Sequence, residues 1–424
     1  MEVLKKIYQS QLFKISSLNS LSIILKIGIG LVTSKLLAVF VGPSGMALVG
    51  NLRNFMTSLE SVSTLGFQNG IVKYVAETKE DKSQLQKILS TVFISLVVIA
   101  VFLSGVLFLF AAFWNQEIFG NHCQYHSVFK VLGLALPWYV ISIFLISVLN
   151  GLGSFKKVIW INSIGNAIGL VISIVLILEY RTFGALLAIV FSPALLFLVS
   201  FYFVNKEINI FNTISRTAFD FEIIKNLSSY SLMALVSSVI GPLVFLSIRN
   251  NIIQTLDYSQ AGYWETMTRI STYYMLFVST ILTVYFLPKL AVAKDNQGTK
   301  NVFWSYYKGI LPVFILGVTA VYFLRFYIVK LLFTAEFLPV SSLFFWQLVG
   351  DVLKVSSLIL GYQFFAKKLT VAFIITELLS LSIIYFSSVF LVSIYGLEGV
   401  VMAHALTYFV YLIMLAVYFR KSLF

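Results

Sequence analysis

Long apolar stretches alternate with short polar gaps along the whole chain. An apolar run of about 20 residues is the length that an α-helix needs to cross a bilayer. Twelve such runs can be delimited, and the gaps between them are too short to hold a soluble domain. The predicted spans are 16–40, 45–75, 88–114, 125–151, 157–179, 184–204, 227–255, 262–289, 302–325, 340–365, 369–394 and 398–419.

The composition agrees with this pattern. Of 424 residues, 59% are hydrophobic and only 11% are charged, and the mean hydropathy is +0.94. So few charges could not cover a soluble protein of this size, so we predict an all-α integral membrane protein. A single cysteine, Cys123, excludes an intramolecular disulfide.

Lysine and arginine are distributed unequally between alternate gaps. If the N-terminus is cytoplasmic, only Lys130, Arg181, Arg325 and Lys330 fall in outer segments. The positive-inside rule therefore predicts that both termini are cytoplasmic. Because most of the net charge of +13 then reflects topology, no nucleic-acid partner is predicted.

The two halves of the chain resemble each other at a nearly constant offset. The motif LNGLGSFKK, which ends at Lys157, parallels LGYQFFAKK, which ends at Lys368, and GALLA from Gly184 parallels GVVMA from Gly399. Repeats of six helices have the same orientation and commonly enclose a substrate site near the membrane midplane. The predicted lobes are residues 1–210 and 211–424.

Ionisable residues inside the predicted spans are the main candidates for function. Such groups are costly at membrane depth and persist where they face a partner or a wet cavity. Lys35 and Lys73 lie near span ends, where their side chains can reach the interface. The others are the cations Lys26, Arg53, Arg249, Arg269 and Lys354 and the acids Glu60, Glu265, Asp351 and Glu377.

Sequence spacing predicts which of these charges are paired within one helix. Glu265 and Arg269 are four residues apart, and Asp351 and Lys354 are three apart, so each pair can neutralise itself on one face. Lys26 has no acid within helical reach. We therefore expect Lys26 to face the cavity between the lobes.

Arg53 and Glu60 stand seven positions apart in the predicted span 45–75. Seven positions make nearly two helical turns, so both side chains share one face. They are too far apart for a tight bridge within the helix. Each is expected to find a partner on another helix, or water.

The balance of these charges indicates an anionic cargo. Five cations stand against four acids, whereas an exporter of cationic drugs is expected to be acidic inside. Arginine presents a planar fork that suits phosphate, and lysine supplies a point charge. We assign headgroup binding to Lys26, Arg53, Arg249 and Arg269. Glu60, Asp351 and Glu377 are candidates for binding a coupling proton, and Lys354 and Glu265 are structural or cavity charge partners.

Signatures of catalysis are absent from the sequence. It contains no nucleotide-binding P-loop and no HExxH motif, and its three histidines are too scattered for a metal site. No catalytic residue, metal or cofactor is therefore predicted. Any uphill transport would draw on an ion gradient or on the substrate gradient.

Five segments carry a resemblance to a known family. They are KIGIGLVTSKLLAV (Lys26–Val39), VGPSG (Val41–Gly45), NLRN (Asn51–Asn54), NGIVKYVA (Asn69–Ala76) and WQLVGDVLKV (Trp346–Val355). With them the chain resembles the Wzx-type lipid-linked oligosaccharide flippases of the multidrug/oligosaccharidyl-lipid/polysaccharide exporter superfamily. The resemblance implies two six-helix lobes in a V that work by alternating access in the bacterial inner membrane. It also implies an oligosaccharide on undecaprenyl pyrophosphate as cargo, with a polysaccharide polymerase and chain-length machinery as further partners.

Two other functions remain open from the sequence. A drug or small-ion antiporter of the same superfamily would show a net acidic cavity. A membrane polymerase of surface polysaccharide would need a substantial periplasmic loop with reactive residues. The longest predicted outer loop, 326–339, offers only Lys330 and Glu336 as ionisable groups, so the polymerase is the less favoured of the two.

Overall fold

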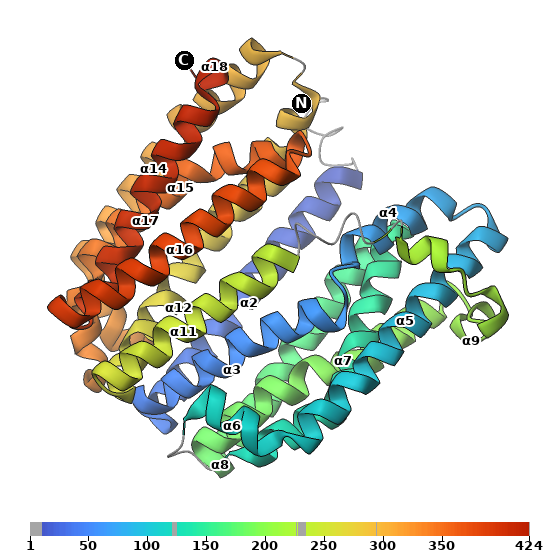
Figure 1. The fold of residues 1–424 in the computed structure, drawn as a ribbon, viewed down its shortest axis with the longest axis horizontal. Helices are drawn as coiled ribbons and strands as arrows, with labels where there is room; N and C mark the ends of the chain where they lie inside the picture. The colour runs from blue at the N-terminus through green and yellow to red at the C-terminus, as the bar shows by residue number, and fades with distance from the viewer. Residues whose placement is uncertain (1–10, 121–124, 226, 228–234, 294, 424) are drawn as a thin grey trace. The chain divides into compact units, whose positions relative to one another are not determined.

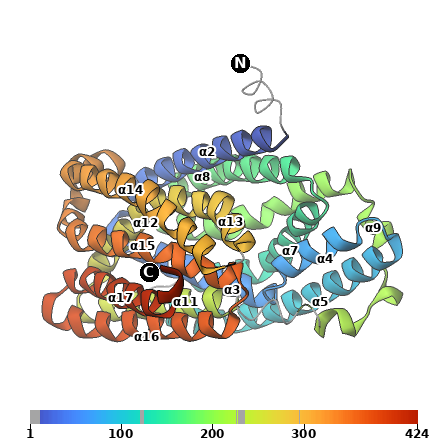
Figure 2. The ribbon, with the colours of Figure 1, turned by 90° about the horizontal axis from the view of Figure 1, so that it is seen from above.

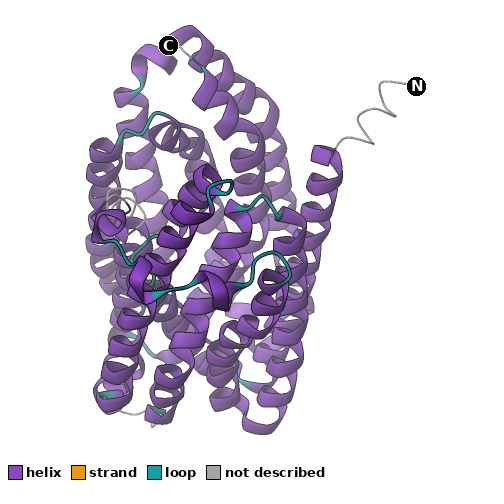
Figure 3. Cartoon of the chain, turned by 90° about the vertical axis from the view of Figure 1, so that its right-hand side faces the viewer, coloured by secondary structure: helices purple, strands orange, loops and turns teal. Residues whose placement is uncertain are grey.

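The computed structural model describes residues 11–120, 125–225, 227, 235–293 and 295–423, and in those ranges all regular structure is helical (Figure 3). Nine helical stretches within these ranges are long and apolar enough to cross a membrane, which confirms a multi-span helical membrane protein. Cys123 and residues 228–234 of the predicted span 227–255 lie outside the described residues.

The chain forms two compact units. The first comprises Met1–Val41 and Asn51–Val239, and the second comprises Gly42–Gly50 and Ile240–Phe424. One helix, α3 (Gly42–Ser63), contributes its first residues to the second unit and the rest to the first. The other helices of the first unit are α2 (Gln11–Phe40), α4 (Gln68–Thr78), α5 (Lys82–Leu109), α6 (Ala111–Phe119), α7 (His126–Gly151), α8 (Phe155–Asn205), α9 (Ile210–Thr213) and the 3-10 turn η1 (Arg216–Ala218).

In the first unit, α7 packs against α5 and α8, and α2 lies along α8 (Figures 1 and 2). The long helix α8 covers the predicted spans 157–179 and 184–204. It is broken at Arg181, whose φ of 50° and ψ of −123° are not helical. The sequence placed a gap between two spans at this point, and the backbone break confirms that division.

The predicted span 45–75 is not continuous. The helix α3 ends at Ser63 and α4 begins at Gln68, with positive φ angles of 53° at Leu65 and 64° at Gly66 between them. The left-handed region is strained for leucine and permitted for glycine, and helices commonly end in this way. The average hydropathy of this stretch stays high across the turn and therefore did not reveal it, whereas Gly66 is the residue that could have indicated it.

The second unit holds the remaining elements. They are the π-helix η2 (Val236–Ile240, of which Ile240 belongs to this unit), α11 (Gly241–Thr255), α12 (Tyr258–Ile281), the π-helix η3 (Leu282–Phe286), α13 (Leu287–Val292), α14 (Asn296–Leu332), the 3-10 helix η4 (Ala335–Leu343), α15 (Phe344–Ala366), α16 (Thr370–Tyr395), α17 (Glu398–Tyr418) and α18 (Arg420–Leu423). The helix α17 packs against both α15 and α16, and α15 also packs against α14 (Figure 1). Both π-helices directly precede a helix with proline in its first turn, Pro242 and Pro288. A proline cannot donate the i→i−4 hydrogen bond, so the preceding turn widens there.

The carboxylate of Glu207, just beyond the C-terminus of α8, contacts residues at the N-terminal end of the same helix. It accepts hydrogen bonds from Lys157 Nζ at 2.7 Å and from Ser154 Oγ at 2.6 Å. These two donors hold the pKa of Glu207 below its usual range, the lysine having the larger effect. The contact is partly exposed, so we expect it to stabilise the fold by less than about 1 kcal/mol.

Candidate functional site

Three buried charges of the second unit form a triad of two arginines and one glutamate. Arg249 on α11 places Nη2 2.7 Å from Glu265 Oε2, and Arg269 on α12 places Nε 3.1 Å from Glu265 Oε1. All three side chains are at most 6% exposed. The i,i+4 pairing predicted for Glu265 and Arg269 is confirmed, and the cluster keeps a formal charge of +1.

The triad has close neighbours on both sides. The guanidinium of Arg249 lies over the ring of Trp264, 5.1 Å from its centroid, and Phe245 stacks against the same indole at 6.0 Å. On the α3 side stands Gly50. A Cβ at this position would lie 2.5 Å from Glu265 Oε2 and 2.8 Å from Arg249 Cζ, so only glycine leaves room for the triad as it is packed.

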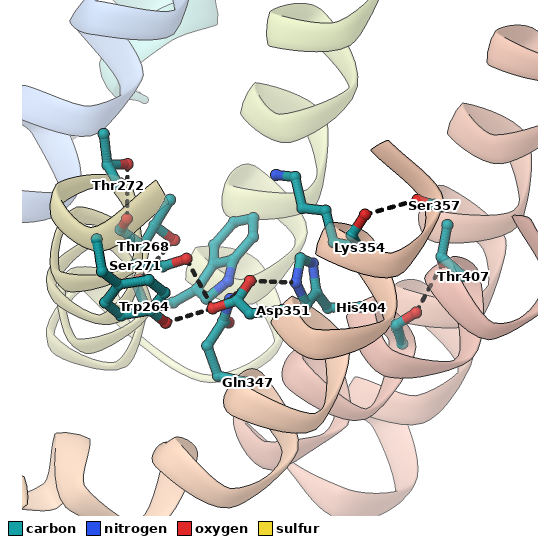
Figure 4. A network of polar contacts seen from close by, with 12 residues as sticks. Trp264, Thr268, Ser271, Thr272, Gln347, Asp351, Lys354, Ser357, His404 and Thr407 are labelled. Carbon is teal, nitrogen blue, oxygen red and sulfur yellow. Dashed lines mark hydrogen bonds and ion pairs between the residues drawn. The ribbon is translucent and has the colours of Figure 1, made fainter. Parts of the chain in front are cut away.

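A second polar network surrounds Asp351 on α15 (Figure 4). Its Oδ1 lies 3.0 Å from His404 Nε2, and its Oδ2 accepts a hydrogen bond from Ser271 Oγ at 2.7 Å. The phenol of Tyr274 also donates to Oδ2, and the amide of Gln347 lies 3.2 Å from Oδ1. The carboxylate is fully buried and joins α12, α15 and α17.

Asp351 and Lys354 interact electrostatically, as their spacing predicted, but they form no direct ion pair among the described residues. The carboxylate contacts His404 from another helix, and the amine of Lys354 is directed away from it (Figure 4), lying 5.2 Å from the ring centroid of Tyr408. A Cβ at Gly350 would come within 2.3 Å of the His404 ring. The missing side chain at Gly350 is what lets the imidazole approach, and local spacing could not reveal it.

Partners of Asp351 and the aromatic neighbours of the triad line one cavity of about 320 Å³ within the second unit. Its wall includes Trp264 from α12, Lys354 from α15 and His404 from α17. The remaining lining residues are Phe245, Thr268, Ser271, Thr272, Met275, Leu276, Ser279, Gln347, Leu358, Ile384 and Val400. Among the described residues of this lining, aspartate and glutamate are absent.

In the first unit, Glu60 finds its partners on other helices, as its isolation on α3 predicted. Its Oε1 accepts a hydrogen bond from Gln68 Nε2 on α4 at 3.0 Å, and its Oε2 accepts one from the phenol of Tyr139 on α7. Arg53 and Lys26 are exposed in the structure. Their assignment to a common headgroup site stays a prediction.

Glu377, the third acid assigned to proton coupling, lies on α16 and is half-buried. Its role in proton coupling also stays a prediction.

The two units contain the same acid–tyrosine contact with the roles exchanged. In the first unit the acid is on α3 and the tyrosine on α7, namely Glu60 and Tyr139. In the second unit the tyrosine is on α12 and the acid on α15, namely Tyr274 and Asp351. The corresponding positions are separated by nearly the offset of the sequence repeat. The repeat therefore keeps the contact and exchanges its partners.

We expect Tyr139→Phe and Tyr274→Phe each to destabilise the protein by about 1.5–3 kcal/mol, because each removes one hydrogen bond to a carboxylate, half-buried at Glu60 and fully buried at Asp351. Thermal unfolding of the purified protein in detergent measures this loss. The exposed Tyr285 serves as a control, since its phenol contacts Lys289 and no carboxylate. Equal stability of all three variants would contradict the prediction.

Within the described ranges, no group of three or more histidine, cysteine, aspartate or glutamate side chains could hold a metal ion. His122 and Cys123 lie outside those ranges. The networks at Glu265 and Asp351 consist of ion pairs and hydrogen bonds among protein groups.

The fold is shared with transporters of known structure. It matches the inward-facing conformation of a multidrug resistance MATE family transporter of the MOP superfamily with a TM-score of 0.78 and 14% identity, covering 94% of this chain and 97% of that one. It also matches the lipid II flippase MurJ, inward closed conformation, with a TM-score of 0.70 and 15% identity over 96% and 87% of the two chains.

Residues 12–294 match the polysaccharide biosynthesis protein family, and the chain belongs to that family. It is 29% identical over 408 residues to the lipid III flippase of Escherichia coli (strain K12), covering 94% of this chain and 96% of the relative. The lipid III flippase of Shigella flexneri matches equally well. The sequence-based family assignment is thereby confirmed. The chain is a multi-span inner-membrane protein of a transporter family and not an enzyme.

Proposed function

We propose that the chain is a flippase that moves oligosaccharide linked to undecaprenyl pyrophosphate from the cytoplasmic to the periplasmic leaflet by alternating access. The observation that carries the proposal is the match to a lipid III flippase along nearly the whole chain. The excess of cations over acids among the ionisable residues of the predicted spans supports the same conclusion. A pyrophosphate headgroup could not cross bare hydrocarbon without such partners, because of its desolvation cost.

Four cations act on the headgroup in this proposal. Lys26 and Arg53 are exposed and make direct contact with the phosphates. Arg249 and Arg269 are held in the buried triad. They act through its charge of +1, which is felt strongly in a region of low dielectric constant.

Three acids couple transport to protons. Glu60, Asp351 and Glu377 take up and release the coupling proton. Contacts of Glu60 and Asp351 with tyrosines on neighbouring helices support this role, because protonation removes the charge that these donors stabilise. Helix packing around each acid would then respond to its protonation.

The proposed architecture has twelve spans in two six-helix lobes, residues 1–210 and 211–424, with both termini in the cytoplasm. The bias of lysine and arginine between alternate gaps supports this orientation. The proposed partners are the lipid bilayer, the lipid-linked oligosaccharide, a polysaccharide polymerase and the machinery that sets chain length.

The second candidate is a multidrug or small-ion antiporter. It is favoured by the TM-score of 0.78 with a multidrug transporter. A cationic drug would require acids in the cavity, whereas the ionisable groups that line the 320 Å³ cavity are Lys354 and His404. The flippase is therefore the better supported function.

Deletion of the gene is expected to make one lipid-linked oligosaccharide accumulate in the cytoplasmic leaflet. The intact gene should clear it, and Arg53→Ala should reduce clearance about tenfold or more, because a lost charged contact is worth about 1.5–3 kcal/mol. Extraction and quantification of lipid-linked sugars provides the measurement.

Two controls make this experiment decisive. Arg53→Lys keeps the charge and should retain part of the clearance, and Lys73→Ala removes an exposed cation paired with Glu77 and should clear normally. Sensitivity to cationic drugs without accumulation of any lipid-linked sugar would refute the flippase and favour the antiporter.

A further inference from the structure

We propose that the 320 Å³ cavity of the second unit is a saccharide-binding site, in which hydroxyl oxygens on α12 bind a sugar residue of the cargo. The proposal rests on the proposed function, because it assigns the sugar part of a lipid-linked oligosaccharide to this cavity. It separates that part from the pyrophosphate, which the cations Lys26 and Arg53 bind.

A row of hydroxyl groups runs along the cavity face of α12. Thr268, Thr272 and Ser279 all line the cavity, and their spacing of four and seven residues places them on one helix face. Each donates its own proton to the backbone carbonyl four residues earlier, at 2.9, 2.8 and 3.0 Å respectively. We call these three side chains the hydroxyl row.

The internal hydrogen bonds decide what the hydroxyl row can bind. A hydroxyl whose proton is already donated keeps its lone pairs and acts as an acceptor. Ser271, beside the row, likewise gives its proton to Asp351, at 2.7 Å. The wall therefore presents acceptors, and a ligand on it must supply donors.

A sugar residue supplies such donors and a phosphate does not. Sugar hydroxyl and acetamido groups donate hydrogen bonds, whereas an ionised phosphate offers acceptors and would face the lone pairs of the row. The chemistry of this wall therefore points to the saccharide and away from the pyrophosphate.

A sugar also has acceptor oxygens and an apolar C–H face, and the rest of the cavity offers groups that can contact both. The amine of Lys354 supplies donors for ring, hydroxyl or carboxylate oxygens. Phe245 presents an apolar ring to the C–H face of a sugar, and this ring is supported by Trp264, stacked at an interplanar angle of 20°. The volume of 320 Å³ lies at the lower end of small-molecule sites, about 300–1,000 Å³, which suits a short saccharide.

The test compares two probes that differ only in sugar. The first is the lipid-linked oligosaccharide fraction extracted from the source bacterium lacking this gene, and the second is undecaprenyl pyrophosphate. Each is titrated into the purified full-length protein in detergent, and the half-saturating concentration is read from tryptophan fluorescence. The wild type should bind the sugar-bearing fraction at least tenfold more tightly.

The double substitution Thr268→Val and Thr272→Val removes two acceptors and preserves shape. It should lower the sugar advantage to twofold or less and leave the affinity for undecaprenyl pyrophosphate within twofold of the wild type. Thr319→Val on α14 removes a threonine with the same internal hydrogen bond, to Ile315, away from the cavity. It should change neither affinity, and thermal unfolding verifies that all variants fold.

Two results would overturn the inference. One is a sugar advantage that survives the double substitution. The other is equal binding of both probes by the wild type, with Lys354→Met weakening both, which would make the cavity a phosphate site. Neither result touches the proposed function, which fails only if no lipid-linked sugar accumulates on deletion.

Discussion

Replacing Glu265 with glutamine is expected to destabilise the protein by about 3–5 kcal/mol, the cost of leaving buried charges without their counter-ion. Both Arg249 and Arg269 contact this one carboxylate, and both are at most 6% exposed. Glutamine keeps the shape and loses the charge, so the cluster would change from +1 to +2. Thermal unfolding in detergent and the amount of protein in the membrane measure the loss.

Glu77→Gln is the matched control. Glu77 pairs with Lys73 at 3.7 Å in the same i,i+4 arrangement, but on an exposed surface. Such pairs are worth about 0–1 kcal/mol, so the control should unfold nearly as the wild type does. Equal losses in the two variants would show that the buried triad does not contribute as its burial implies.

A triple replacement separates structure from transport at the same site. Arg249→Met, Glu265→Leu and Arg269→Met together exchange the triad for apolar side chains, and such exchanges of buried ion pairs are often neutral or stabilising. The variant should recover the stability lost in Glu265→Gln. If the charge of the triad acts on the headgroup, it should nevertheless clear the lipid-linked oligosaccharide poorly.

Gly50→Ala is expected to lower the stability of the protein, whereas Gly105→Ala is expected to raise it. An exposed or loosely packed helical glycine gains up to about 1 kcal/mol on replacement by alanine, and a Cβ at Gly105 would meet nothing within 4 Å. At Gly50 the Cβ would press on Glu265 and Arg249 at 2.5 and 2.8 Å. Overpacking of this kind costs about 1–3 kcal/mol.

The measurement is the unfolding temperature of Gly50→Ala and Gly105→Ala, each against the wild type. Gly50→Ala should destabilise the triple apolar variant less than it destabilises the wild type, because methionine can rearrange where a paired guanidinium cannot. An unchanged or higher unfolding temperature for Gly50→Ala alone would contradict a triad fixed in this position.

The membrane class and most helix positions followed from the sequence because burial in lipid demands long apolar helices. Breaks inside helices were harder to see. A turn at Gly66 and a kink at Arg181 differ from the regular helix by the φ angles of one or two residues. A hydropathy pattern averages over many residues and does not resolve such short breaks. It predicted the break at Arg181 only because charged residues also interrupt the apolar run there.

Local charge pairing was predictable, and distant pairing was not. The i,i+4 spacing of Glu265 and Arg269 predicted a contact that the structure contains, because one helix fixes both side chains. Asp351 instead contacts His404, fifty-three residues away. Whether a carboxylate turns to its own helix or to a neighbour depends on packing, here on the space left by Gly350.

The sequence by itself determined a helical membrane protein, its family and the set of ionisable residues within its apolar runs, since all three depend on composition, local spacing or shared motifs. Only the tertiary structure decided how those charges are partnered. In the structure Arg249 belongs to the triad, and the hydroxyl row lines a cavity. Tyr139 donates a hydrogen bond to Glu60, and Tyr274 donates one to Asp351. These contacts join different helices, and residue spacing along one helix does not show which residues of other helices will lie beside it.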